Sequence, residues 1–118
     1  MSFSSIDDYR STLSEIQLWW FDQVVNHVRQ NHPTLRFALS YQRPTFTIKP
    51  KLFLMLGGGK NHFSIYTTDF DYVNSLKNKK IPGLKFGKSA VLFPLQQKQM
   101  LSDAIQVCEE VIHRGSMR

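Results

Sequence analysis

Apolar residues recur at three- and four-residue steps in the first third of the chain, which is the period of an α-helix with one buried face. This stripe runs from Leu18 to Val28, and Ser14 stands where its hydroxyl can cap the first turn. Because Pro33 pushes the residue before it out of the helical region, we expect the helix to end at about Gln30.

The end of the chain repeats this spacing. A second apolar stripe predicts a helix over about residues 97–113, ended by Gly115. A shorter helix is expected over residues 6–9, with Ser4 or Ser5 accepting an orphan backbone N–H as its cap. Helices therefore stand at both ends of the predicted structure.

Three consecutive aromatic residues, Trp19-Trp20-Phe21, lie on the first long helix. One helical stripe cannot bury all three, so we expect Trp20 and Phe21 in the core and Trp19 near the rim, beside Glu15 and Asp22. Trp19 then either packs against the short first helix or marks a dimer contact, because exposed aromatics often mark interfaces. The sequence is therefore compatible with either a monomer or a homodimer.

The middle of the chain changes to the two-residue alternation of β-strands. Five strands are expected, at residues 36–41, 45–48, 52–56, 62–67 and 90–93. Lys49-Pro50-Lys51 is a predicted hairpin turn, and a short helix is expected over residues 69–76, capped by Thr68 or Asp69. A basic loop is expected at Lys77–Lys80 and Pro82-Gly83.

This order of elements predicts an α+β fold. Connections of hairpin length exclude a sheet built from parallel crossovers. We therefore expect an antiparallel sheet of about five strands, with the N- and C-terminal helices packed on one face. At 118 residues the chain is one domain over residues 1–118, with its core at about 5–113.

Composition supports a folded protein in a reducing compartment. With 42% hydrophobic and 13% aromatic residues, intrinsic disorder is excluded as a class. The longest apolar run, Leu52–Leu56, is too short for a membrane span, and the first residues lack the pattern of a signal peptide. A lone cysteine allows no internal disulfide, so we expect a cytoplasmic protein with no membrane association.

Charge is unevenly distributed along the chain, whose net charge is +6. The segment 1–32 carries −2, 33–100 carries +9 and 101–118 carries −1. In the basic middle, cations interleave with aromatics on the predicted strands, a pattern that can hold single-stranded nucleic acid. The aromatics are Tyr41, Phe46, Phe53, Phe63, Tyr66 and Phe86, and the cations are Arg43, Lys49, Lys51, Lys60, Lys85 and Lys88. The alternative is that the aromatics form the core while the lysines keep edges and turns soluble.

No motif predicts catalysis. Gly83-x-x-x-Gly87-Lys88-Ser89 is one residue short of a phosphate loop, and a strand follows it where that loop needs a helix. Cys108 falls on the buried stripe of the last helix, which favours an inert thiol. Asp69 and Asp71 are better explained by helix capping than by acid–base chemistry. We therefore expect a protein that is not an enzyme.

The histidines do not predict a transition-metal site. His27 and His32 lie on or just past the first long helix, where we expect solvated surface positions, and His62 opens a strand. Glu110-x-x-His113 has the spacing of a di-iron helix, but no second pair of this kind exists.

Four short segments together resemble the YdhG-like family, small bacterial cytosolic domains of largely unknown function. The segments are Ile6-Asp7-Asp8-Tyr9, Ser40-Tyr41-Gln42-Arg43-Pro44-Thr45-Phe46, Lys60-Asn61-His62-Phe63-Ser64-Ile65-Tyr66 and Gly87-Lys88-Ser89-Ala90-Val91-Leu92-Phe93-Pro94-Leu95. The family-motif positions among them are Tyr41, Pro44, Phe46, Lys60, His62, Lys88, Phe93 and Pro94. Order and spacing agree over about residues 5–113.

The resemblance implies a frataxin-like fold and a non-enzymatic binding module, since some members are described as intracellular iron chaperones for iron–sulfur or haem assembly. It implies no tightly bound cofactor, weak Fe(II) binding by carboxylates and a protein partner. The candidate ligands on the first helices are Asp7, Asp8, Glu15 and Asp22. The alternative, from the charge pattern, is that the basic sheet binds nucleic acid or an acidic protein.

Overall fold

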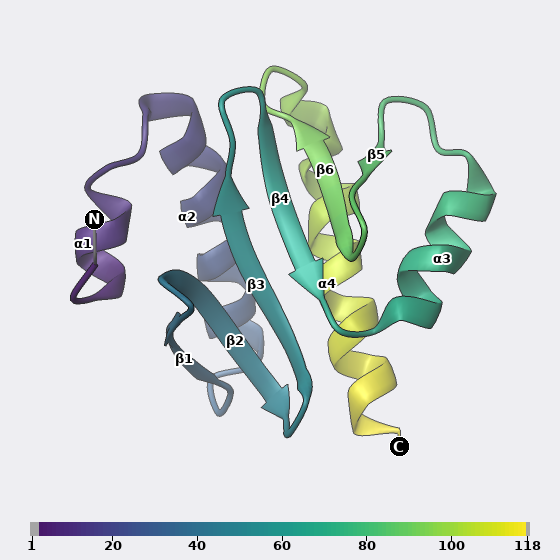
Figure 1. The fold of residues 1–118 in the computed structure, drawn as a ribbon, viewed down its shortest axis with the longest axis horizontal. Coiled ribbons are helices and arrows are strands. Elements are labelled where there is room, and N and C mark those ends of the chain that lie inside the picture. Colours follow the sequence, from purple (N-terminus) through teal and green to yellow (C-terminus); the bar gives the residue numbers. More distant parts are fainter. Residues whose placement is uncertain (1–2, 118) are drawn as a thin grey trace.

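The computed structural model describes residues 3–117 and contains one six-stranded antiparallel sheet (Figure 1). Its strands lie in the order β1-β2-β3-β4-β6-β5. Their bounds are Arg36–Ser40 (β1), Arg43–Lys49 (β2), Leu52–Gly58 (β3), His62–Thr67 (β4), Lys85–Phe86 (β5) and Ala90–Pro94 (β6). The helices are Ile6–Arg10 (α1), Glu15–Asn31 (α2), Phe70–Lys79 (α3) and Leu101–Ser116 (α4), with a 3₁₀ turn at Lys98–Met100. None of the helices in residues 3–117 is long and apolar enough to cross a membrane.

The α+β architecture is confirmed, but the sheet has six strands where the sequence predicts five. The additional strand, β5, contains only Lys85 and Phe86, which pair with Leu92 and Val91 of β6. Two residues are too few to show an alternating pattern in the sequence. This strand is therefore identified only by its pairing with β6 in the structure.

Helix α2 begins with the predicted cap. The Ser14 side chain accepts from the Gln17 backbone N–H, and the Gln17 side chain accepts from the Ser14 N–H, which completes a capping box. Helix α3 is capped by Asp69, which accepts from the Tyr72 N–H at 3.2 Å. Its far end differs from the prediction, because residues 77–79 are its last turn rather than a loop, and Lys80 ends it in the left-handed conformation.

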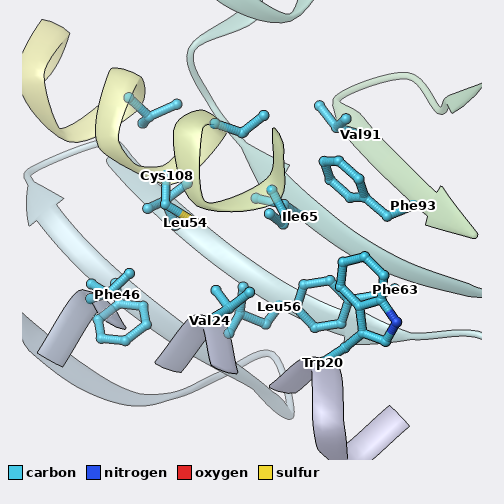
Figure 2. Packing of buried hydrophobic residues seen from close by; sticks show 14 of the residues in the cluster. Trp20, Val24, Phe46, Leu54, Leu56, Phe63, Ile65, Val91, Phe93 and Cys108 are labelled. Carbon is cyan, nitrogen blue, oxygen red and sulfur yellow. The ribbon is translucent and has the colours of Figure 1, made fainter. Parts of the chain in front are cut away.

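Trp20 fixes α2 to the centre of the sheet (Figure 2). Its ring stacks on Phe63 of β4 at 5.7 Å and on Phe93 of β6 at 6.0 Å between centroids. Its indole Nε1–H donates to the Leu95 carbonyl at 2.9 Å, so the one polar atom of a fully buried side chain has a partner. Trp20 and Phe21 are buried and Trp19 is half-buried, as predicted.

Helix α4 passes through Gly115, which the sequence predicts as its end. Gly115 is buried, and a Cβ atom there would lie 2.6 Å from Cδ2 of Leu52 and 2.9 Å from Cγ2 of Ile48. This glycine is therefore required by the close approach of α4 to the hairpin between β2 and β3. It does not serve to stop the helix.

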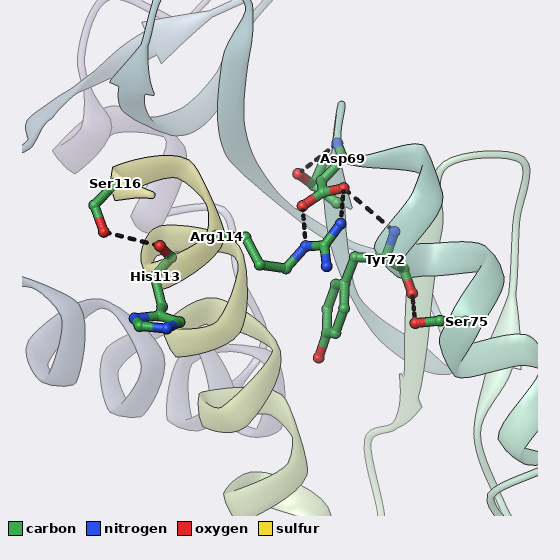
Figure 3. A network of polar contacts seen from close by, with 7 residues as sticks. Asp69, Tyr72, Ser75, His113, Arg114 and Ser116 are labelled. Carbon is green, nitrogen blue, oxygen red and sulfur yellow. Dashed lines mark hydrogen bonds and ion pairs between the residues drawn. The ribbon is translucent and has the colours of Figure 1, made fainter. Parts of the chain in front are cut away.

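A partly buried ion pair joins the start of α3 to the end of α4 (Figure 3). The Asp69 carboxylate is 2% exposed and accepts two hydrogen bonds from Arg114, at 2.7 and 3.2 Å. The same guanidinium lies over the Tyr72 ring at 5.6 Å. Asp69 therefore caps one helix and holds the other, which agrees with a structural role for this carboxylate.

We expect Gly115→Ala to destabilise the protein by about 1–3 kcal/mol, because the added methyl overlaps Leu52 and Ile48. Urea unfolding measures this, with exposed Gln106→Ala on the same helix as the control. At a helical position with space for a methyl group, a Gly→Ala substitution would instead raise the free energy of unfolding by about 1 kcal/mol. A gain in stability would therefore contradict the close packing of α4 on the hairpin.

Candidate functional site

The sheet has one covered face and one open face. Strand register places Phe46, Leu54 and Ile65 toward α2 and α4, where they are buried. Figure 1 looks onto the opposite face, and β2, β3 and β4 lie in front of α2 and α4 there. Within residues 3–117 no helix lies over this side of the sheet. We call it the open face, and its larger side chains are Arg36, Arg43, Thr47, Phe53, Met55, Tyr66, Lys85 and Leu92.

The open face is positively charged and contains no acidic residue. Arg36, Arg43 and Lys85 project from β1, β2 and β5 and are exposed. No strand contains Asp or Glu, because all nine acidic residues lie in the helices or, for Asp69, at the cap of α3. Lysines 49, 51, 60 and 88, at the ends of strands and in turns, add charge around the sheet.

Arg43 and Tyr66 form the most defined feature of this face. The guanidinium carbon of Arg43 lies 5.0 Å from the centroid of the Tyr66 ring, although β3 separates their strands. Gly57 of β3 permits the crossing, since a Cβ there would lie 3.1 Å from Arg43 Nη1 and 3.2 Å from Tyr66 Cε2. Tyr9 of α1 lies near this pair, and burial raises the pKa of its hydroxyl, with the Arg43 charge opposing that rise.

The predicted aromatic surface is only partly present. Of the six aromatics, Phe53 and Tyr66 are half-buried on the open face. Phe46 and Phe63 are buried under the helices, and Phe86 faces the same side as Val91. Tyr41 is 88% exposed at the tip of the hairpin between β1 and β2. Strand alternation divides these residues between the two faces of the sheet. Each of the two alternatives, aromatics in the core and aromatics on the surface, is therefore correct for some of them.

The four candidate iron ligands are not brought together as a site. Asp22 accepts two hydrogen bonds from Arg10, at 2.9 and 2.6 Å. Asp8 accepts from the Ser4 N–H at 3.0 Å, and Asp7 lies with it in the first turn of α1. Glu15 borders a groove beside Trp19 and Lys98, about two turns of α2 away from Asp22. Within residues 3–117 no three His, Cys, Asp or Glu side chains are arranged to hold a metal ion.

The sequence predicts solvated surface positions for His27 and His32, but in the structure both are half-buried and contact Glu109. The Nε2 atom of His32 lies 2.5 Å from Oε2 of Glu109, and that of His27 lies 3.8 Å from Oε1. Both contacts join α2 to α4, which pack side by side on the sheet. This neighbourhood depends on helix packing between residues about 80 apart, and no local pattern in the sequence indicates it.

The family-motif positions are spread over the sheet and do not form one site. Pro44, Phe46 and Phe93 are buried. His62 lies opposite Pro94, where β4 pairs with β6. The remaining three lie in exposed turns, and they are Tyr41, Lys60 and Lys88.

Two further candidates have structural explanations. Burial raises the pKa of the Cys108 thiol to about 12, so the nucleophilic thiolate is disfavoured. The segment Gly83–Ser89 contains β5 and leads into β6, so no helix N-terminus stands behind it to hold a phosphate.

These features define a small α+β domain with a helix-covered antiparallel sheet and one open basic face. No family model matches the chain, and no curated protein matches it. Its fold is similar to that in a crystal structure of YdhG, a protein of the DUF1801 family from Bacillus subtilis. The TM-score is 0.67 over 85% of this chain and 84% of that one, at 13% sequence identity. This likeness establishes a shared fold, in agreement with the YdhG-like architecture that the sequence predicts.

We expect Cys108 to resist alkylation in the folded protein at pH 8, because its thiol is buried and its pKa is raised. Mass spectrometry after maleimide treatment measures this. The control is the same reaction in denaturing urea, where labelling should be complete. Labelling at equal rates in both solutions would show that the thiol is accessible and reactive.

Proposed function

We propose that this protein is a non-catalytic binding module that holds single-stranded nucleic acid on the open face of its sheet. The observation that supports this most directly is the uncovered surface on which Phe53 and Tyr66 lie among three exposed cations, with no acidic residue. Positive grooves that track a backbone and aromatic rings that stack on bases are the two elements of such sites.

The arrangement assigns a role to each group. Phe53 offers an apolar ring to a base, and the planar guanidinium of Arg43, over Tyr66, offers a second stacking surface. Arg36 and Lys85 lie near opposite edges of the sheet, five strand spacings apart, which is roughly 24 Å. They can contact phosphates at the two ends of a short segment, close to the lower end of known site sizes, roughly 4 nucleotides.

An acidic protein surface is the other ligand class that fits the charge. It would use Arg36, Arg43 and Lys85 equally well. It would not by itself require the aromatic ring of Phe53, whereas stacking on any base does. The role of Phe53 therefore separates the two ligands.

The iron-carrier role that the YdhG-like resemblance implies stays a prediction, as does the frataxin-like fold. The likeness to YdhG concerns the fold, and Asp22 is already bound by Arg10. Weak carboxylate sites for Fe(II) need several oxygen ligands around one position. The open face has more support as the functional surface, because its groups lie on one side of one sheet.

The charge contribution can be tested with a pair of double variants of equal net charge. We expect Arg36→Gln/Lys85→Gln to weaken binding of a fluorescein-labelled oligothymidylate at about 50 mM salt and to lower the salt slope by about 1.4. Fluorescence anisotropy measures both. The control Lys79→Gln/Lys98→Gln removes two lysines that lie beside α4 and Trp19, on the helix side of the sheet. Equal losses of affinity in the two variants would show that binding depends on net charge alone and not on the open face.

Phe53→Leu should weaken binding of the same oligothymidylate, because it removes the aromatic ring while keeping the apolar bulk. Full loss of one base–ring stack costs about 1–3 kcal/mol of binding free energy. Unchanged oligonucleotide binding by this variant would favour an acidic protein as the ligand. Absence of any binding by the unaltered protein at low salt would overturn the nucleic-acid function itself.

An anaerobic Fe(II) titration followed by amide NMR tests the iron role separately. We expect no shifts near Asp7, Asp8, Glu15 or Asp22 at millimolar iron, because Arg10 occupies Asp22 and the structure gathers no compact ligand set around these four residues. Saturable shifts at these four residues would support the iron carrier instead.

A further inference from the structure

The sheet ends in two edge strands of different character. At one edge, β5 contains only Lys85 and Phe86 and is followed by Lys88, and short charged edges resist pairing with other chains. At the other edge, β1 has five residues, and its only charge is Arg36 at its start. Phe37, Ala38 and Leu39 follow and are half-buried. Edge β1 therefore lacks the protection that β5 has.

The outward backbone groups of β1 follow from the hairpin register. Tyr41 and Gln42 form a two-residue turn with φ values of 52° and 64°, so Ser40 and Arg43 are the hydrogen-bonded pair next to it. Hydrogen-bonded and non-bonded pairs alternate from there. The N–H and C=O groups of Phe37 and Leu39 therefore point away from β2, and β1 ends the sheet on that side.

We propose that β1 pairs antiparallel with β1 of a second copy of this chain, about a two-fold axis at Ala38. In this register Phe37 of each copy lies opposite Leu39 of the other. The four outward N–H and C=O groups of each copy are then used in four inter-chain hydrogen bonds, and a free edge becomes a continuous ladder.

The strand is complementary to itself in this register. On the helix side, Phe37 packs opposite Leu39, an apolar pair. On the open side, Ala38 meets Ala38, and Arg36 stands opposite Ser40, so no like charges face each other. A two-fold interface requires such self-complementarity, whereas an unrelated peptide would have to match the pattern by chance.

Tyr41 provides an independent reason to cover this edge. It is the most exposed large hydrophobic side chain in residues 3–117, at 88%, and it is held in the left-handed conformation directly after β1. In the proposed register it extends past the end of the strand toward Leu35 of the second copy. Burial against that residue would account for an aromatic ring that contacts little within one chain.

Pairing in this way would place both open faces on the same side of a twelve-stranded sheet, since the two-fold axis of an antiparallel pair runs perpendicular to the sheet. The edge geometry does not depend on the proposed nucleic-acid function. A dimer without oligonucleotide binding, or the reverse, would show which of the two proposals fails.

The test compares two lysine substitutions of equal charge on the same face. Ala38→Lys sets two lysines against each other at the axis, whereas Thr47→Lys adds the same charge on the exposed neighbouring strand. In sedimentation equilibrium up to about 0.5 mM we expect the unaltered protein and Thr47→Lys to approach twice the 13.8 kDa of the chain. Ala38→Lys should associate at least about tenfold more weakly, because like charges would be directly opposed.

Hydrogen exchange in the unaltered protein gives a second test that needs no variant. The amides of Phe37 and Leu39 should exchange more slowly at about 0.5 mM than at about 5 µM, since dimers form by mass action. The amide of Ala38, which bonds β2 within the chain, serves as the internal control. A monomer throughout this range, or a dimer that Ala38→Lys leaves intact, would overturn the proposal.

Discussion

The indole of Trp20 is the contact on which the arrangement of this protein depends. It joins α2 to β4 and β6 through Phe63 and Phe93, and its N–H reaches the Leu95 carbonyl beyond the end of β6. Placing α2 here brings it beside α4 on one side of the sheet (Figure 2). Two long helices can cover one face of six strands, and the other face is left to side chains that the core does not use.

This division between faces also divides the charge. The acidic residues lie on the helices, where first-turn carboxylates such as Asp7, Asp8 and Glu15 favour the helix dipoles. Arg36, Arg43 and Lys85 come from strands, which contain no acid. The acidic residues therefore lie away from the open face, whereas cations such as Arg10, Arg29 and Arg114 also occur in the helices.

The sequence carried enough information for α2, most of α4 and five of the six strands, because the helices have long periodic patterns or identifiable caps and the five strands alternate. It could not show β5, whose two residues have no period, or the role of Gly115, which depends on Leu52 and Ile48 reaching α4. The contact of His32 with Glu109 was missed for the same reason. The open face was predicted only in part, since alternation alone does not say which face the helices cover.

A shared fold does not carry a ligand from one protein to another, because binding depends on the side chains that the fold presents. This chain and YdhG have the same architecture at 13% identity, so most surface positions differ between them. In this chain Asp22 is held by Arg10, whereas Phe53 and the Arg43–Tyr66 pair lie on the open face of the sheet with Arg36 and Lys85. A ligand with negative charge and flat rings would match the positive charge and the aromatic rings of the open face. A metal cation would be repelled by that charge.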